Sequence, residues 1–251
     1  MHPKITHLAS SVPLYIQIAE KLISQIEDGQ LLPGDKLPTE RELSTSLEVQ
    51  RATVRQAFSV LEDRGLIIRK RGSGTYVAEA KIEREATQLF AFTKIMTDRG
   101  YKTGAKVVSC VKIEASSHTA KVLQIAAGDP IYYYHRLRLL NDEPLMLEKI
   151  QLPASVFPDF DSHDLERHSL FEIMEKEYGR VVTTAEQALE AVRASEYEAG
   201  ILDVQPGAAL MMEERASRDQ YGAMVEFSRD LYRGDRFRFV VENARFDIEI
   251  K

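Results

Sequence analysis

Apolar residues in the first part of the chain recur at the spacing of amphipathic helices. The first set, at four-residue steps, comprises Leu14, Ile18, Leu22 and Ile26. It predicts a helix that ends at Gly29. Thr39 followed by Glu42 fits a capping box, in which each side chain bonds the backbone N–H of the other residue, and this predicts a second, short helix from Thr39.

A third apolar face and two strand-like runs complete this region. The apolar face comprises Val54, Ala57, Phe58 and Leu61. Gly65 predicts the end of the helix that carries this face. Residues 66–70 and 75–78 are strand-like, and the glycines between them predict a turn. Three helices followed by a two-stranded hairpin predict a winged helix-turn-helix over residues 1–77.

The remainder of the chain changes character at residue 78. Residues 78–90 are charged and alanine-rich without a strong core pattern, which predicts a partly helical linker. Strand-like segments follow at 105–115, 130–153, 181–192, 209–234 and 237–250. Short helical stretches lie between them at 117–125, 169–179 and 195–203. The irregular order predicts an α+β domain over residues 91–251 with a mostly antiparallel sheet.

The two halves of this second domain resemble each other at an offset of 79 residues, which we set to 78 after the hairpin turn. The matched positions are Gly128 with Gly207, Arg136 with Arg215, and Glu148 with Glu226. Chance similarity between two amphipathic hairpins is the alternative. The recurrence of both the arginine and the glutamate favours a repeat, and it predicts two helix-hairpin units in one sheet with a pseudo-twofold relation.

Charge is unevenly distributed along the 251 residues, whose net charge is −6. Residues 1–78 hold ten Lys/Arg and nine Asp/Glu, and within residues 51–71 six basic residues face two acidic ones. An acidic protein with one basic face can still bind DNA, because phosphate contacts depend on the local field. The single cysteine excludes an internal disulfide, and no apolar run approaches a membrane span, so we expect a cytoplasmic protein.

The glycine-rich stretch at residues 70–77, KRGSGTYV, raises the alternative of a nucleotide-binding loop. Such a loop leads from a strand into a helix N-terminus, where amides and the helix dipole meet the phosphates. Here the glycines lead into a strand-like run, and their spacing fits neither a Walker-type nor a dinucleotide-binding motif. We therefore interpret the stretch as the tip of a wing that approaches the phosphates of DNA.

Arginines on the third helix favour DNA as the partner. Arg51 and Arg55 are one turn apart and share a face away from the apolar residues, and Thr53 beside them can donate to a phosphate. An arginine fork can bind O6 and N7 of guanine in the major groove. A merely solvated helix face is the alternative, which the helix order, the basic hairpin and the local charge disfavour.

A second pair of arginines indicates an anion site in the second domain. Arg136 and Arg138 are two apart on a predicted strand, so both side chains point to one face of the sheet. Two converging guanidiniums favour a phosphate or carboxylate compound between them, and an exposed face paired with acids is the alternative. Glu148 and Glu226 stand among apolar neighbours, where sugar hydroxyls would be suitable partners.

Residues 13–77 resemble the DNA-binding domain of the GntR family of bacterial transcription regulators. The resemblance implies that Arg41, Arg51 and Arg55 contact DNA and that Gly72 approaches the minor groove. Gln50 departs from the Ser or Thr usual in the family, so the operator sequence is less transferable than the binding mode. The resulting candidate DNA-binding residues are Thr39, Arg41, Arg51, Thr53, Arg55, Arg69, Lys70, Arg71 and Gly72.

The second domain resembles the effector-binding (UTRA) domain of the HutC-like branch of that family, whose fold is related to chorismate lyase. The resemblance implies an anion site at Phe92, Thr93, Arg136, Arg138 and Ser169. It further implies that Glu148, Glu226 and Tyr232 line the rest of the pocket. Phe171 departs from the tyrosine of phosphosugar sensors, which puts a phosphosugar in doubt and leaves an anionic effector.

Together these features predict a homodimeric, effector-responsive transcription regulator that binds double-stranded operator DNA. We expect a repressor that a small anionic metabolite, a phosphosugar or an organic acid, releases from its operator. We expect no enzymatic activity, metal or cofactor, and we interpret His163 and His168 as surface residues. The alternatives are a lyase-like enzyme carrying a DNA-binding domain and an architectural DNA-binding protein without a ligand.

Overall fold

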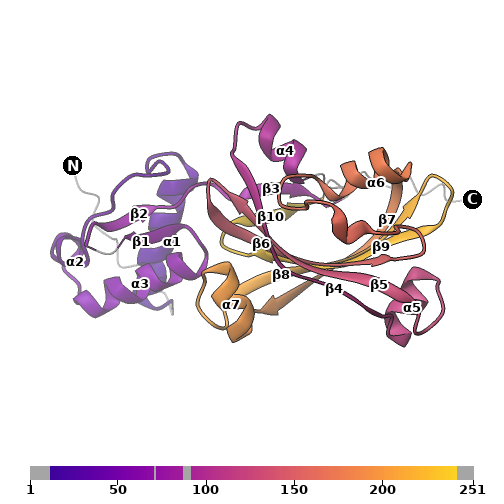
Figure 1. The fold of residues 1–251 in the computed structure, drawn as a ribbon. Coiled ribbons are helices and arrows are strands. Elements are labelled where there is room, and N and C mark those ends of the chain that lie inside the picture. Colours follow the sequence, from indigo (N-terminus) through magenta and orange to yellow (C-terminus); the bar gives the residue numbers. More distant parts are fainter. Residues whose placement is uncertain (1–11, 71, 87–91, 242–251) are drawn as a thin grey trace, which may run out of the picture. The chain divides into compact units, whose positions relative to one another are not determined.

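The computed structural model describes residues 12–70, 72–86 and 92–241 (Figure 1). The chain divides into two compact units, Met1–Ile82 and Glu83–Lys251. Each unit has a hydrophobic core of its own. None of the described helices is long and apolar enough to cross a membrane.

The N-terminal unit contains three helices and a hairpin. Its elements are α1 (Leu14–Glu27), α2 (Glu40–Leu47), α3 (Arg51–Asp63), β1 (Ile67–Lys70) and β2 (Gly74–Val77). The apolar faces of α1 and α3 meet in one core around Ile18, Val54 and Phe58. β1 and β2 pair antiparallel. The predicted winged helix-turn-helix is therefore confirmed.

The start of α2 follows from its capping box. The Thr39 hydroxyl accepts a hydrogen bond from the Glu42 N–H at 3.2 Å, and the Glu42 carboxylate accepts one from the Thr39 N–H at 2.8 Å. Two backbone donors that the helix leaves unpaired are thereby satisfied. The cap fixes where the chain turns into α2, which matters because α2 precedes α3 by a short connection.

The C-terminal unit is built on one six-stranded sheet in which all pairs are antiparallel, in the order β4-β5-β6-β9-β8-β7. The strands are β4 (Thr103–Glu114), β5 (Pro130–Leu140), β6 (Glu143–Pro153), β7 (Val182–Arg193), β8 (Ala209–Asp219) and β9 (Met224–Arg233). The helices are α4 (Phe92–Asp98), α5 (Ser117–Leu123), α6 (Leu170–Tyr178) and α7 (Glu196–Leu202), with a 3₁₀ turn η1 (Phe160–Ser162). In Figure 1, α4 and α6 lie on one face of the sheet and α5 and α7 on the other. The predicted α+β class is confirmed.

The range expected to be a partly helical linker holds a strand in the part that the structure describes. β3 (Ile82–Glu85) pairs with β10 (Phe237–Val240) in a separate two-stranded sheet. The alternating burial of β3 buries Ile82 and Arg84 and leaves Glu83 and Glu85 exposed. The sequence pattern concealed this strand because one of its two inward side chains is an arginine.

The predicted repeat is present, but its alignment after the turn was wrong. β4, α5 and β5 correspond to β7, α7 and β8 at an offset of 79 residues. Arg136 pairs with Glu148, whereas Arg215, 79 positions later, pairs with Ser228, which is 80 positions after Glu148. The residue equivalent to Glu148 is therefore Ser228, and Glu226 lies two positions away from it.

The difference between the two hairpin turns explains the shift. The first hairpin turns through Asn141 and Asp142 alone, both with positive φ, which is the two-residue turn suited to twisted strands. The second hairpin has a three-residue turn, residues 220–222, because the N–H of Asp219 donates to the Ala223 carbonyl across it, so this turn is one residue longer than the first. A longer turn moves every later residue along its strand, and the sequence match of two glutamates hid that movement.

Candidate functional site

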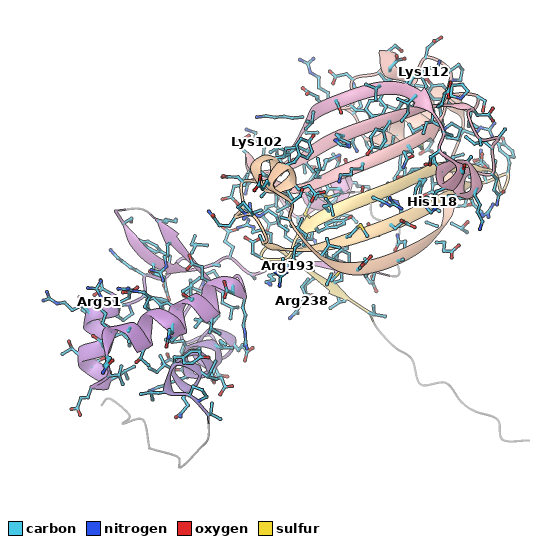
Figure 2. The ribbon with its side chains drawn as sticks, turned by 90° about the horizontal axis from the view of Figure 1, so that it is seen from below. Arg51, Lys102, Lys112, His118, Arg193 and Arg238 are labelled. Carbon is cyan, nitrogen blue, oxygen red and sulfur yellow. The ribbon has the colours of Figure 1, made fainter. Side chains whose placement is uncertain are left out.

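The exposed face of α3 is the candidate nucleic-acid interface. Val54 and Phe58 are buried in the core, whereas Arg51 and Arg55 expose 61% and 59% of their side chains. Figure 2 labels Arg51 on this helix. α3 begins at Arg51, directly after Gln50, whose side chain makes no cap bond. The one-turn spacing therefore presents both guanidiniums from one solvent-exposed face.

A carboxylate that the sequence analysis did not single out gathers these arginines. Glu40, the first residue of α2, accepts hydrogen bonds from Nε of Arg51 at 3.1 Å and Nε of Arg55 at 3.3 Å. Its other oxygen accepts from Arg69 of β1 at 3.2 Å. The Glu40 side chain is 12% exposed. Two elements, α3 and β1, thus place three basic side chains around a single acid of α2.

These three arginines favour the ionised form of Glu40. Burial opposes its ionisation, but the hydrogen bonds from Arg69, Arg55 and Arg51 keep the pKa of Glu40 below its ordinary value. Ion pairs whose basic side chains are this exposed contribute about 0–1 kcal/mol each. The arginines can therefore leave Glu40 for a phosphate or a base at small expense in stability.

The wing carries further candidate residues. The exposed Lys70 places Nζ 5.1 Å from the centre of the Tyr76 ring. Gly72 has a φ of +74°, which favours glycine, and no protein atom lies within 4 Å of the position of an added Cβ. At Gly74 an added Cβ would lie 2.8 Å from Cε of Lys36. Arg71, another candidate, lies outside the described residues.

The remaining candidates in this unit differ in their availability. Arg41 is exposed on α2, and Thr53 is half-buried beside the arginines of α3. The hydroxyl of Thr39 is engaged in the capping box, where it also donates to the Glu42 carboxylate at 2.9 Å. Thr39 therefore acts on the position of α2 in this structure, and its assignment as a DNA contact stays a prediction.

The second candidate site is a small cavity in the C-terminal unit, of about 20 Å³, between the sheet and residues of α4 and α6. Eight of the nine predicted effector residues line it: Phe92, Thr93, Arg136, Arg138, Glu148, Ser169, Phe171 and Tyr232. The other lining residues are Met146, Leu170, Arg215 and Asp230. Residues far apart in the sequence thus converge on one cavity.

Glu226 is the predicted effector residue that does not line the cavity. It is fully buried beside Arg215, whose two nitrogens donate to it at 2.6 and 3.3 Å, and it also accepts from Ser217 at 2.5 Å. Glu226 also does not occupy the position equivalent to Glu148 in the repeat, and its assignment as an effector contact stays a prediction. In this structure Glu226 holds Arg215, which itself reaches the cavity.

Arg136 and Glu148 form a buried ion pair on the floor of the cavity. Arg136 donates through Nε to Glu148 at 2.5 Å and through a terminal nitrogen to the Leu165 carbonyl at 3.2 Å. Although burial opposes it, Arg136 and Arg138 hold the pKa of Glu148 below its ordinary value. The expectation that both arginines share one face is confirmed, and both are buried rather than exposed.

Arg138 differs from Arg136 because it has no acid of its own. It donates to the Thr93 hydroxyl at 2.7 Å, and its guanidinium carbon lies 4.5 Å from the centre of the Phe92 ring. Among the described residues it forms no ion pair, and its buried Nε has no hydrogen-bond partner. Burial lowers the pKa of Arg138 to about 10. The buried guanidinium of Arg138 thus lines the cavity without an ion-pair partner among the described residues.

The beginning of α6 adds hydrogen-bond donors to the same cavity. Ser169 precedes the first residue of α6 and lines the cavity, and its side chain makes no cap bond to the helix. The start of a helix favours negative charge because its first N–H groups are unpaired. Phe171 follows within this turn, and its ring centre lies 5.6 Å from the guanidinium carbon of Arg215.

A network of buried charges continues away from the cavity along β8 and β9. Arg84 of β3 donates to both oxygens of Glu213 at 2.5 Å and to the Tyr232 hydroxyl at 2.8 Å. Glu213 also lies 3.5 Å from Arg215, and Asp230 lies 3.3 Å from it. The sequence could not indicate these contacts, since Arg84 and Glu213 are 129 residues apart.

The described residues contain no group of three His, Cys, Asp or Glu side chains that could hold a metal ion. His163 is half-buried and lies 3.0 Å from the Tyr178 hydroxyl through Nε2, whereas His168 is exposed. His163 is therefore less of a surface residue than the sequence analysis expected, because the ring packs against Phe160 and Tyr178.

Comparison with known families matches both units. The model for bacterial regulatory proteins of the gntR family matches residues 14–77, and the model for the UTRA domain matches residues 98–238. The first match covers the three helices and the wing. The second covers all six strands of the large sheet, including the residues of β5, β6, β8 and β9 around the cavity.

Individual proteins resemble the chain over nearly its whole length. The HTH-type transcriptional repressor NagR of Bacillus subtilis (strain 168) is 34% identical over 231 residues, which cover 92% of this chain and 95% of NagR. The mannosyl-D-glycerate transport/metabolism system repressor MngR of Escherichia coli (strain K12) is 32% identical over 231 residues, which cover 91% and 95%. These relatives are named as transcriptional repressors and not as enzymes.

A solved structure agrees with these matches. The crystal structure of PhnF from Mycobacterium smegmatis has a TM-score of 0.64 and 26% identity, and it covers 92% of this chain and 99% of that chain. The UTRA match and the repressor relatives confirm the predicted resemblance to the HutC-like branch. On the matched models, the repressor relatives and the fold, the chain belongs to the GntR family of bacterial regulatory proteins, as a DNA-binding regulator with the UTRA domain of the HutC subfamily.

Proposed function

We propose that this regulator is a homodimeric repressor. A small anionic metabolite that binds in the cavity of the C-terminal unit releases it from its operator. The observation that carries the proposal is Arg138, a buried guanidinium without an ion-pair partner among the described residues. A buried charge that lacks a counterion is costly, so a site that keeps one is best explained by a ligand that supplies the opposite charge.

The groups around Arg138 suit a phosphate or a carboxylate. The Thr93 hydroxyl, the Ser169 hydroxyl and the first turn of α6 offer hydrogen bonds, and Arg138 can donate two in parallel. Phe171 has no hydroxyl to add, so organic acids fit this proposal as well as phosphosugars. Phe92 covers the guanidinium from one side and limits the size of the anion.

The size of the cavity supports a ligand-dependent change. A cavity of about 20 Å³ accommodates roughly one water molecule, whereas metabolite pockets measure about 300–1,000 Å³. Binding therefore requires side chains around the cavity to move. An effector that prefers the rearranged form shifts the population toward it, and the repressor leaves DNA to the extent that this form binds DNA less well.

On the DNA side we propose that Arg51, Arg55 and Arg41 contact the operator and that the wing follows the phosphate backbone. Two such units in a twofold dimer would match a near-palindromic site. The exposed guanidiniums around Glu40 support this assignment, because their present ion pairs are weak enough to exchange for nucleic acid.

Thermal unfolding with inorganic phosphate, phosphosugars and organic acids tests the effector site. We expect at least one anion to raise the melting temperature of the wild type and to lose that effect in Arg138→Met. The matched control is Arg229→Met, which removes an arginine paired with Glu214 outside the cavity. Unchanged stabilisation of Arg138→Met by the same anion contradicts the proposal.

A further inference from the structure

Within the cavity, one acidic residue remains unexplained by an anion site. Asp230 is fully buried on β9 and lines the cavity, and its Oδ1 has no hydrogen-bond partner among the described residues. Its other oxygen lies 3.3 Å from Arg215 and accepts a long hydrogen bond from Ser228 at 3.4 Å. A buried acceptor of this kind normally has a donor.

The pairing of the buried charges shows which groups around the cavity lack a close partner. Three arginines each have a glutamate within hydrogen-bond distance: Arg84 with Glu213, Arg136 with Glu148, and Arg215 with Glu226. Arg138 has no acid within ion-pair distance among the described residues, and Asp230 keeps one oxygen without a donor although its other oxygen faces Arg215; both residues line the same cavity. A ligand that satisfies both carries a negative group for Arg138 and a donor for Asp230.

Burial disfavours the charged form of both residues, the cation of Arg138 and the anion of Asp230. Burial lowers the pKa of Arg138, and the nearby Glu148 only partly offsets that effect, so an anion close to the guanidinium would favour its charged form. Burial raises the pKa of Asp230 well above its ordinary value, a shift that Arg215 opposes and that the nearby Glu148 reinforces. Arg215 at 3.3 Å does not offset this burial, so an ammonium group at the free Oδ1 of Asp230 would favour its ionised form, which a hydroxyl would do less.

The distance between the two positions suits a small metabolite. Arg138 pairs with Met146, Met146 pairs with Tyr232, and Asp230 lies two residues from Tyr232 on the same face of the sheet. Two strand spacings across and two residues along place the two Cα atoms about 12 Å apart. An arginine side chain and a ligand of a few carbon atoms bridge that span.

We propose that Asp230 forms a second subsite that binds an ammonium group, so that the effector is a small zwitterion with a phosphate or carboxylate at the Arg138 end. This inference rests on the proposed anion site and adds to it the class of the ligand. Glu148 lies directly across from Asp230 on β6 and contributes negative charge to the same end of the cavity.

The test uses the full chain and matched alkyl phosphates, measured by calorimetry or thermal unfolding. The probes are aminoalkyl, hydroxyalkyl and plain alkyl phosphates with two and three carbons, together with inorganic phosphate. We expect the wild type to bind an aminoalkyl phosphate about tenfold or more tightly than its two counterparts, as for a charge-assisted bond. The substitution Asp230→Asn should remove this preference and leave plain alkyl phosphate within about twofold of its wild-type affinity.

A control variant separates the role of Asp230 from the general effect of removing a carboxylate. Glu214→Gln, which changes a carboxylate of β8 outside the cavity, should retain the preference for the amine. Equal binding of the three probe classes, tighter binding of the hydroxyalkyl phosphates, or an amine preference that survives Asp230→Asn overturns the ammonium subsite. If no probe binds, inorganic phosphate included, the anion site of the proposed function fails as well. The wild-type comparison decides the question even where the Asn variant does not fold.

Discussion

Two groups of arginines in this protein meet carboxylates in opposite surroundings. Around Glu40, the guanidiniums of Arg51 and Arg55 are mostly exposed and share one acid. In the C-terminal unit, Arg84, Arg136 and Arg215 are buried, and each has its own glutamate. The same chemical pair therefore serves two purposes: exposed pairs exchange partners readily, whereas buried pairs fix geometry because breaking them strands a charge.

The largest effect on stability is expected from removing one member of a buried ion pair. Arg84→Met leaves Glu213 buried without its bidentate partner, and we expect the C-terminal unit to lose about 3–5 kcal/mol of unfolding free energy. Chemical denaturation followed by circular dichroism measures the loss. The double variant Arg84→Met with Glu213→Leu should recover much of it, since no unpaired charge remains. A loss in the double variant that equals the loss in the single variant would mean that packing, and not charge, dominates.

Removing an exposed arginine should act on DNA binding and not on folding. For Arg51→Ala we expect operator affinity to fall by about 1–3 kcal/mol, the range of one good base contact, with the melting temperature unchanged. Fluorescence anisotropy on an operator obtained by selection from random DNA gives the affinity. Lys21→Ala on α1 is a control that leaves the arginine face intact. Intact binding after Arg51→Ala combined with Arg55→Ala contradicts the recognition helix.

The capping box offers an intermediate test, because it positions α2 without carrying charge to DNA. Thr39→Ala should lower the unfolding free energy of the N-terminal unit by about 1 kcal/mol. Thr39→Ser preserves the cap and should restore most of the stability. If Thr39 also touches DNA, the loss of affinity in the alanine variant will exceed what the small change in stability explains.

A substitution at Glu40 tests the acid that the exposed arginines share, and its effect on stability should be small. Its pKa is lowered in the folded state, so its stabilising contribution is present above the ordinary carboxyl pKa and is lost as pH falls through the lowered value. Glu40→Gln should alter unfolding free energy at pH 7 by no more than about 1 kcal/mol and remove this acid dependence. DNA affinity should rise, because the arginines lose a competing anion. Weaker binding would show that Glu40 orients them for DNA.

Much of the N-terminal unit was predictable because its signals are local. The helical periodicity, the cap at Thr39 and the glycine turn before β2 lie within short stretches of sequence, and all three agree with the structure. Glu40 escaped notice because its partners on α3 and β1 are 11 to 29 residues away. Such pairs depend on how the helices pack, which no local pattern records.

The cavity was predictable only in part, because some of its residues follow a local pattern and others depend on strand pairing. Alternation along β5 placed Arg136 and Arg138 on one face, and the structure agrees. Glu226 was matched to the wrong position of the repeat because the lengths of two hairpin turns, and not the sequence match, decide strand register. Asp230 attracted no attention because a single acid in a strand carries no motif. Its significance emerges only from the neighbours that the sheet brings to it.

The near-twofold arrangement of the sheet has a consequence for orientation. A duplicated framework could in principle accept a ligand in either of two senses, yet the position equivalent to Arg138 is Ser217 and the position equivalent to Glu148 is Ser228. Hydroxyls replace charges in one copy only. The two halves of the framework therefore differ in charge. We expect an asymmetric ligand to bind in a single orientation.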